Sequence, residues 1–236
     1  MNKMAVFVEG GTELEFDSKL IQEIASPRQI TIESLKIKGG TTIKKKIERI
    51  GVMHTDGTGA TSTHHILLFN CGNDNLTKER MRDEYGDLCK SGYTGIICHR
   101  DVAPGFTHAE IPTLRLGLPL FVKIDPIRVT FVLSVMEVEA WFLAEHTHFG
   151  RIAPTITVEA IKANLGFDPS VDDMQARPAP VDDLIRCYAI GGKLYDKYTN
   201  LTTTNAIDYV EIYCEVANRF PDLEVLRNTI SDFLAT

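Results

Sequence analysis

The sequence contains no long hydrophobic run. No stretch of its 236 residues approaches the roughly 20 mostly apolar residues that a membrane-spanning helix needs. The apolar run at residues 4–8 is too short for a secretory signal, and no small-residue cleavage pattern follows it. We therefore expect a cytoplasmic protein without membrane contact.

The motifs of several common enzyme classes are also absent. The chain has neither a Gly-x-x-x-x-Gly-Lys-Ser/Thr loop nor a Gly-x-Gly-x-x-Gly turn, which disfavours an intrinsic NTPase and a dinucleotide-binding enzyme. It has no Gly-x-Ser-x-Gly elbow of a serine hydrolase. The seven histidines include the pairs His64/His65 and His146/His148, but none has the spacing of a zinc site.

Cysteine is scarce and unpatterned. The count is five, which is odd, and no pair has Cys-x-x-Cys spacing. Most of the cysteines lie in apolar stretches, so we expect buried, reduced thiols and neither a disulfide framework nor a redox site. They are Cys71, Cys89, Cys98, Cys187 and Cys214.

Positive charge is in deficit, with a formal net charge of −7. This balance argues against a general nucleic-acid coat protein, but it does not exclude a local basic groove. The contents of hydrophobic residues (44%) and charged residues (24%) are ordinary for a globular protein. A chain of this length can bury a sizeable core without disulfides or a structural metal.

Short apolar segments and helical patterns alternate along the first half of the chain. This alternation predicts an α/β fold with a mostly parallel sheet flanked by helices. We expect residues 1–150 to form this α/β domain and residues 151–236 to form a helical extension packed on it. The expected strands are 4–8, 30–37, 65–70, 93–98 and 128–135. The expected helices are 12–25, 42–51, 76–91, 137–145, 157–165, 181–190, 205–217 and 222–235.

Local signals refine three of these segments. Thr12, followed by Glu15 three residues later, fits the N-cap and capping box of the first helix. Residues 54–63 are rich in Gly and Thr and predict a loop. The Pro-rich residues 174–180 predict an exposed loop.

Two acidic residues follow predicted strands directly. Glu9 closes the first strand before two glycines, and Asp101 closes the strand that ends Cys98-His99-Arg100. Ligands bind outside the carboxyl ends of strands in open α/β sheets, and the two acids share that edge if their strands are neighbours. Mg²⁺ relieves the repulsion between two such carboxylates. The alternative for Glu9 is a solvated turn carboxylate.

A third acidic site precedes the only tryptophan of the chain. Glu137 and Glu139 stand just before Trp141. Helix positions i and i+2 do not share a face, so we expect only one of the two acids to reach the site. The alternative is a helix N-terminus that favours acids, with Trp141 in the core.

A basic cluster surrounds the turn at residues 39–42. A Gly-rich turn before a helix is a natural phosphate site, and lysines add affinity for a nucleic-acid backbone. The alternative is an exposed helix face. The cluster consists of Lys36, Lys38, Lys44, Lys45, Lys46 and Arg49, and Lys193 and Lys197 offer further phosphate contacts.

The order of these motifs resembles the Toprim domain. Three segments carry this resemblance: Val-Phe-Val-Glu-Gly-Gly-Thr-Glu at residues 6–13, His-Arg-Asp-Val at 99–102 and Glu-Val-Glu-Ala-Trp at 137–141. More narrowly, they resemble the small RloB-like Toprim proteins of bacterial anti-phage loci, which are relatives of the OLD-family nucleases. The resemblance covers residues 4–145 and extends only loosely to the helical tail.

The resemblance implies catalytic and metal-binding roles by position. Glu9 matches the strand-end glutamate with acid/base or metal duty, Asp101 matches the first acid of the Asp-x-Asp metal motif, and Glu139 matches a later acid. The second acid of that motif is replaced by Ala103. Glu137, Glu139 or Asp74 would have to compensate for it.

Together these features predict a Mg²⁺- or Mn²⁺-dependent endonuclease that cleaves DNA or RNA, including tRNA, in antiviral defence. Glu9, Asp101 and Glu139 are the expected catalytic residues, and these three with Glu137 are the expected metal ligands. The resemblance implies an ATPase partner and leaves a homodimer open. The alternative is a catalytically silent Toprim scaffold that docks an ATPase and becomes active only on release; Ala103 and the negative charge favour it. A topoisomerase or primase is disfavoured because the chain lacks length for the accompanying module.

Overall fold

The core of the protein is a six-stranded sheet with the order β3-β2-β4-β1-β5-β6. The computed structural model describes residues 1–39, 45–72, 76–195 and 201–236. Within the sheet β3 is antiparallel to β2, whereas all other neighbours are parallel. The predicted α/β fold with a mostly parallel sheet is confirmed. The strands are β1 (Asn2–Val8), β2 (Ile30–Lys38), β3 (Lys46–His54), β4 (His64–Asn70), β5 (Gly95–Asp101) and β6 (Arg128–Ser134).

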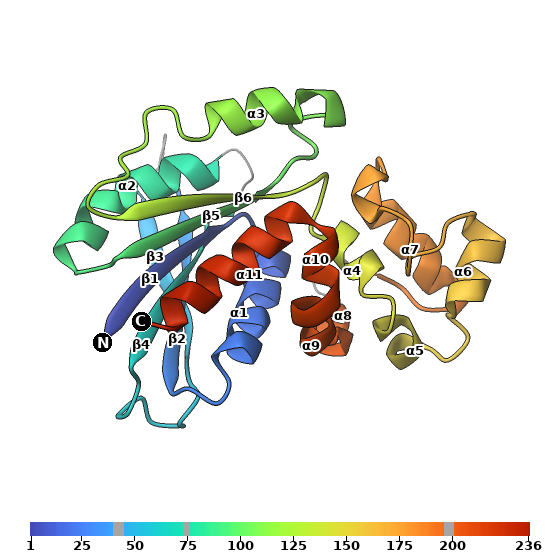
Figure 1. Ribbon diagram of the computed structural model, residues 1–236, viewed down its shortest axis with the longest axis horizontal. Coiled ribbons are helices and arrows are strands. Elements are labelled where there is room, and N and C mark those ends of the chain that lie inside the picture. The colour runs from blue at the N-terminus through green and yellow to red at the C-terminus, as the bar shows by residue number, and fades with distance from the viewer. Residues whose placement is uncertain (40–44, 73–75, 196–200) are drawn as a thin grey trace.

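Helices cover both faces of the sheet (Figure 1). On one face lie α1 (Gly11–Ala25) and α11 (Pro221–Leu234), and on the other lies α2 (Thr77–Lys90). Because side chains alternate along a strand, β1 supplies both cores. Its Val6 and Val8 belong to the α1 core, whereas its Phe7 belongs to the α2 core. The short helix α3 (Ile111–Gly117) follows β5.

The remaining helices gather beyond the carboxyl ends of the strands, on the right in Figure 1. Trp141, Ile161 and Tyr188 from this region share one continuous hydrophobic core with β1 and α1. The segment after the sheet is therefore bound to it by packing. The helices are α4 (Glu139–Ala144), α5 (His148–Ile152), α6 (Val158–Leu165), α7 (Pro180–Ile190), α8 (Leu201–Ala206), α9 (Tyr209–Glu211) and α10 (Ala217–Arg219).

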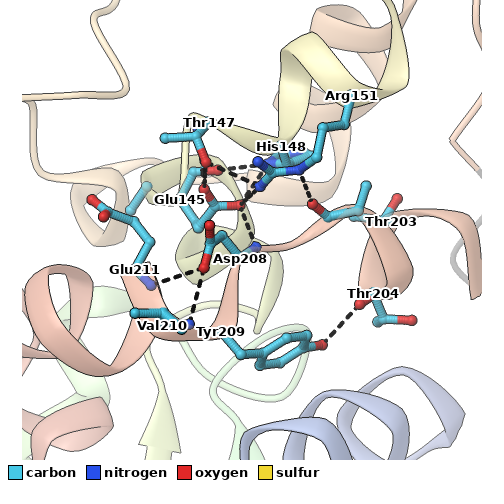
Figure 2. A network of polar contacts seen from close by, with 12 residues as sticks. Glu145, Thr147, His148, Arg151, Thr203, Thr204, Asp208, Tyr209, Val210 and Glu211 are labelled. Carbon is cyan, nitrogen blue, oxygen red and sulfur yellow. Dashed lines mark hydrogen bonds and ion pairs between the residues drawn. The ribbon is translucent and has the colours of Figure 1, made fainter. Parts of the chain in front are cut away.

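A buried polar network ties these helices to one another (Figure 2). The carboxylate of Glu145 is fully buried and accepts hydrogen bonds from the backbone N–H groups of Thr147 (3.1 Å) and Asp208 (3.2 Å). Arg151 approaches the same carboxylate at 3.5 Å. A buried charge is tolerated only when it is paired and hydrogen-bonded, so this network fixes α5 against the start of α9.

The predicted basic helix at 42–51 is wrong. Residues 46–54 instead form β3, an edge strand paired with β2. Ile43, Ile47 and Ile50 recur at helical spacing, but β-branched residues also favour strands. A register shift between Ser34 and Leu35 leaves Ile50 without a paired residue in β2. An interrupted pairing of this kind disturbs the period-2 pattern by which a strand is recognised.

Three other local predictions also differ from the structure. Helix α1 is capped by Gly10, and the backbone N–H of Gly10 donates to Glu13 Oε2 at 2.9 Å, so the cap is not Thr12. A Cβ atom on Gly10 would lie 3.0 Å from that oxygen, so a larger residue would require the Glu13 carboxylate to shift by a few tenths of an ångström. Residues 174–176 form a 3₁₀ turn inside the expected exposed loop, and its Met174 and Gln175 are buried. The expected helix 205–217 is divided, because Asp208 caps a new helix at Tyr209.

In the part of the chain that the structure describes, no helix is long and apolar enough to cross a membrane. The five thiols are free, as expected. Cys71, Cys98 and Cys187 are buried, whereas Cys89 is half-buried and Cys214 is exposed. Burial raises the pKa of Cys98 and of Cys187 to about 12, so both thiols stay protonated and unreactive at neutral pH.

Candidate functional site

The site lies where β1 and β5 end side by side. These strands are parallel neighbours, with Phe7 opposite Cys98, so Glu9 and Asp101 emerge at the same edge of the sheet. Both side chains are buried, with 4% and 2% of their surface exposed. Burying a carboxylate is costly unless its charge is compensated, so this edge has to contain compensating groups.

Arg100 supplies one of these groups. Its Nε lies 3.8 Å from Glu9 Oε1 and donates a hydrogen bond to the backbone carbonyl of Asp101 at 3.1 Å. The residue is only 7% exposed, and Phe106 lies beneath its guanidinium at 5.5 Å. Its Nη2 is buried and has no hydrogen-bond partner within the described ranges. A buried guanidinium with donor capacity left over therefore lies beside Glu9 and against the backbone of Asp101.

Asp101 is fixed by the loop that follows β6. Its Oδ1 accepts the backbone N–H of Val138 at 3.1 Å, in the turn before α4. Met136 adopts a left-handed backbone conformation (φ 63°), and its carbonyl accepts the N–H groups of Val102 (3.1 Å) and Ala103 (2.7 Å). Such strain in a residue other than glycine persists only where the surroundings impose it. The ends of β5 and β6 are thus held together around Asp101.

Glu137 and Glu139 point to different partners. Glu139 is fully buried and accepts the hydroxyl hydrogen of Tyr195 at 2.7 Å, whereas Glu137 Oε2 accepts the backbone N–H of Val181 at 3.2 Å. Burial, together with the charge of Glu139, raises the pKa of Tyr195 far above its usual value, so the phenol remains a donor. Trp141 lies fully in the core, as the alternative interpretation of this segment, a helix N-terminus that favours acids, predicted.

The fit to a divalent metal is partial. Within residues 1–39, 45–72, 76–195 and 201–236, no group of three or more His, Cys, Asp or Glu side chains is placed to hold a metal ion. Mg²⁺ usually binds through only one or two protein carboxylates, with water and phosphate in the other positions. Glu9 and Asp101 supply that number of carboxylates at one edge of the sheet. Asp74 lies outside the described residues.

The basic cluster is largely neutralised. Lys38 and Lys46 both pair with Glu48 at 2.7 Å, and together they lower the pKa of that carboxyl to about 2. Lys45 pairs with Glu84 at 2.5 Å. Lys36 is exposed and has no ion-pair partner in the described part of the chain. Lys44 and Lys197 lie outside the described residues.

Arg49 completes this cluster and is also paired, to Glu33 at 2.7 Å. The cluster therefore forms a strand edge with balanced charge, whereas the sequence suggested a phosphate-binding helix. An exposed ion pair exchanges readily with other partners because it contributes only about 0–1 kcal/mol. The lysines are thus accessible to a phosphate, but they do not form a preorganised groove.

A buried triad of polar side chains was not predicted from the sequence. His99 Nδ1 lies 3.0 Å from Asp17 Oδ2, and His99 Nε2 lies 2.6 Å from Ser134 Oγ. None of the three is exposed, and the imidazole stacks on Trp141 at 5.2 Å. The types of residue are those of a serine hydrolase, but no substrate can reach Ser134 at zero exposure. The triad therefore supports the neighbouring site from inside the core.

Glu13 is a further acid that sequence reasoning passed over. It is 2% exposed, binds the Gly10 backbone N–H, and its charge acts on both His99 and Tyr195. The signal for it was its place at the third position of the helix that follows the strand. It therefore acts on the Glu139–Tyr195 pair from the start of α1.

Known proteins provide no assignment for this arrangement. No family model, curated protein or solved structure matches the chain. The chemistry of the site must therefore be inferred from its own residues.

Proposed function

We propose that the protein is a metal-dependent endonuclease that cleaves phosphodiester bonds of DNA or RNA at the edge formed by Glu9 and Asp101. The observation that carries the proposal is the pair of buried carboxylates at the ends of neighbouring parallel strands, with the buried guanidinium of Arg100 beside Glu9. Mixed positive and negative groups at the carboxyl edge of a sheet suit a substrate that is an anion and a cofactor that is a cation.

The residues of the chain have distinct roles in this proposal. Glu9 and Asp101 would hold Mg²⁺ or Mn²⁺, which when bound polarises the phosphate and lowers the pKa of water. Arg100 would place positive charge beside the phosphate. Glu9 would also accept a proton from the attacking water. Glu139 and Tyr195 would shape the wall on the side of α4.

The resemblance to Toprim proteins of anti-phage loci suggests a cellular role for the proposed nuclease. In that setting the chain would act as the nuclease effector of a defence system, with an ATPase as its partner. The sequence has no P-loop of its own, and the proposal therefore assigns ATP-dependent control to a partner.

A second candidate function is a silent scaffold that docks an ATPase. It is favoured by Ala103, which occupies the position of the second acid in the Asp-x-Asp motif. It is also favoured by the hydrogen bonds that Glu137 and Glu139 already accept from Val181 and Tyr195. In this case the acidic edge would stabilise the fold without binding substrate.

Cleavage assays with defined variants test the proposal. Purified protein would be incubated with plasmid DNA, single-stranded DNA and tRNA in Mg²⁺, Mn²⁺ or EDTA. Metal-dependent cleavage should fall by about 100-fold or more in Glu9→Gln and in Asp101→Asn. Glu23→Gln, which changes an exposed acid on α1, is the matched control and should retain full activity.

Circular dichroism would establish that each variant is folded. Cleavage that survives both substitutions would refute the assignment of this edge. Absence of cleavage by the wild type with every substrate and metal, combined with copurification of an ATPase, would favour the scaffold.

A further inference from the structure

A groove beside α2 carries features that neither the acidic edge nor the lysine cluster explains. Its cavity volume is 530 Å³, and it lies between α2 and residues 121–123 of the segment before β6. Two aromatic residues, Tyr85 and Phe121, and three cations, Arg80, Arg82 and Lys123, line it. We refer to it as the α2 groove.

Phe121 is the most unusual residue of the groove. Its side chain is 85% exposed, and its backbone is left-handed with φ 61°. Exposure of a large aromatic ring and a left-handed backbone in a residue other than glycine are both unfavourable. The adjacent Val122 is half-buried and packs against the α2 core, so it anchors the backbone from which Phe121 projects. The fold thus presents an aromatic face to the solvent.

The cations of the groove differ in burial. Arg82 and Lys123 are exposed, whereas Arg80 is only 6% exposed. The guanidinium of Arg80 donates to the carbonyl of Gly39, and its Nε has no hydrogen-bond partner within the described ranges. Gly39 directly follows β2, which runs parallel to β4 and β1. Arg80 therefore links the groove to the sheet edge at which Glu9 and Asp101 lie.

Two acids, Glu79 and Asp83, also line the groove. They disfavour a bare phosphate, because their charge offsets that of Arg82 and Lys123. Carboxylates accept hydrogen bonds from the amino groups of nucleobases, cations bind phosphates, and aromatic rings stack on bases. A ligand that combines a planar base with a phosphate uses all three kinds of group.

We propose that the α2 groove binds single-stranded nucleic acid, with a base stacked on Phe121 and its phosphate held by Arg82 and Lys123. The inference rests on the proposed nuclease function and deepens it, since it names the substrate as single-stranded. Bases in a duplex are stacked on each other and cannot offer a free face to Phe121. The strand would continue from the groove past Arg80 to the acidic edge.

Binding measured without catalysis tests this inference. Fluorescence anisotropy with a labelled single-stranded oligonucleotide would be recorded in EDTA, beside the same sequence as a duplex and with free AMP as competitor. Wild-type protein should prefer the single strand to the duplex. Phe121→Ala should weaken single-strand binding by about 5-fold to 100-fold because one stacking contact is lost.

Two further variants sharpen the result. Leu194→Ala removes another exposed apolar side chain, 93% accessible and outside the groove, and should bind as the wild type does. The double variant Arg82→Ala/Lys123→Ala should show a shallower dependence of binding on salt, because fewer counterions are released. Free AMP that competes at low concentration would identify a nucleotide pocket and overturn the assignment to a strand.

The inference fails if Phe121→Ala binds as tightly as the wild type, or if the wild type does not bind single strands. In the latter case Leu120 and Ile124, 54% and 64% exposed beside Phe121, would point to a protein partner. The use of EDTA separates the two proposals. Binding of single strands without metal-dependent cleavage would contradict only the proposed nuclease function. Metal-dependent cleavage that is the same in the wild type and in Phe121→Ala would contradict only the assignment of the α2 groove.

Discussion

At the residue scale, the pairing of His99 with Asp17 shows how a buried ion pair supports the site. Burial lowers the pKa of His99, but the charge and hydrogen bond of Asp17 and the charges of Glu13 and Asp222 outweigh it, so the pKa is raised above 6.5. The protonated imidazole links α1 to β5, and Ser134 adds β6. Asp101 is two residues further along β5, so its side chain points to the same face of the sheet as His99.

A pH-dependent contribution to stability follows from the raised pKa. It is fully present below the ordinary pKa of 6.5 and is lost as pH rises through the raised pKa of folded His99. His99→Asn should cost about 3–5 kcal/mol at low pH, because it leaves Asp17 buried without its partner, and less at high pH. Urea unfolding of both proteins from pH 6.5 upward measures this difference. A difference in stability that does not change with pH would show that His99 is neutral in the folded protein.

At the element scale, α11 joins the end of the chain to the sheet. Asp222, in its first turn, accepts the backbone N–H of Leu133 at 3.0 Å and the guanidinium of Arg115 at 2.9 Å. Behind this contact the helix buries Leu226 and Ile230 in the core that it shares with α1. The helix therefore closes one face of the sheet although it is last in the sequence.

The packing of α11 predicts unequal effects of two substitutions on the same helix. Ile230→Ala should lower the free energy of unfolding by about 2–5 kcal/mol, because the side chain is fully buried and leaves a cavity. Val225→Ala, at a position 41% exposed, should change it by less than about 1 kcal/mol. Urea denaturation gives both values. Equal losses would mean that α11 is not packed on the sheet in solution.

At the scale of the whole molecule, helices α4 to α10 gather beyond the carboxyl edge of the sheet (Figure 1). Asp101 and Glu139 are buried at this edge. Each of Asp101, Glu137 and Glu139 contacts a backbone or side chain from this region. In the proposed nuclease the substrate would approach Glu9 and Arg100 from the side of α2, because Glu9 acts electrostatically on Cys71 of the α2 core.

Metal binding at this edge should stabilise the folded protein as a whole. A ligand that binds only the folded state adds about 2.7 kcal/mol at a concentration 100 times its Kd. Thermal unfolding of the wild type should therefore shift upward as Mg²⁺ is added, and the combined variant Glu9→Gln/Asp101→Asn should not respond. An equal shift in both proteins would place the metal elsewhere, and no shift in either would favour the scaffold.

The sequence by itself determined the class of the fold and the placement of the acids. Buried strands such as β1 and β4 are short apolar runs that end at turn residues, and this information lies within each segment. Parallel pairing then puts the carboxyl ends of strands at one edge, so the expectation that Glu9 and Asp101 share it needed only that their strands be neighbours. The same local rules were insufficient for β3, because an edge strand with exposed Ile47, Ile50 and Val52 has no buried face to mark it.

Only the tertiary structure decided what surrounds those acids. Arg100 lies beside Glu9, Tyr195 on Glu139, and His99 against Asp17, which is 82 residues away in sequence. The outward projection of Phe121 likewise depends on how its neighbour Val122 packs beneath α2. Such contacts join segments that are distant in the chain. They follow from the packing of the whole core, whereas residue spacing reports only which side chains share a face within one element.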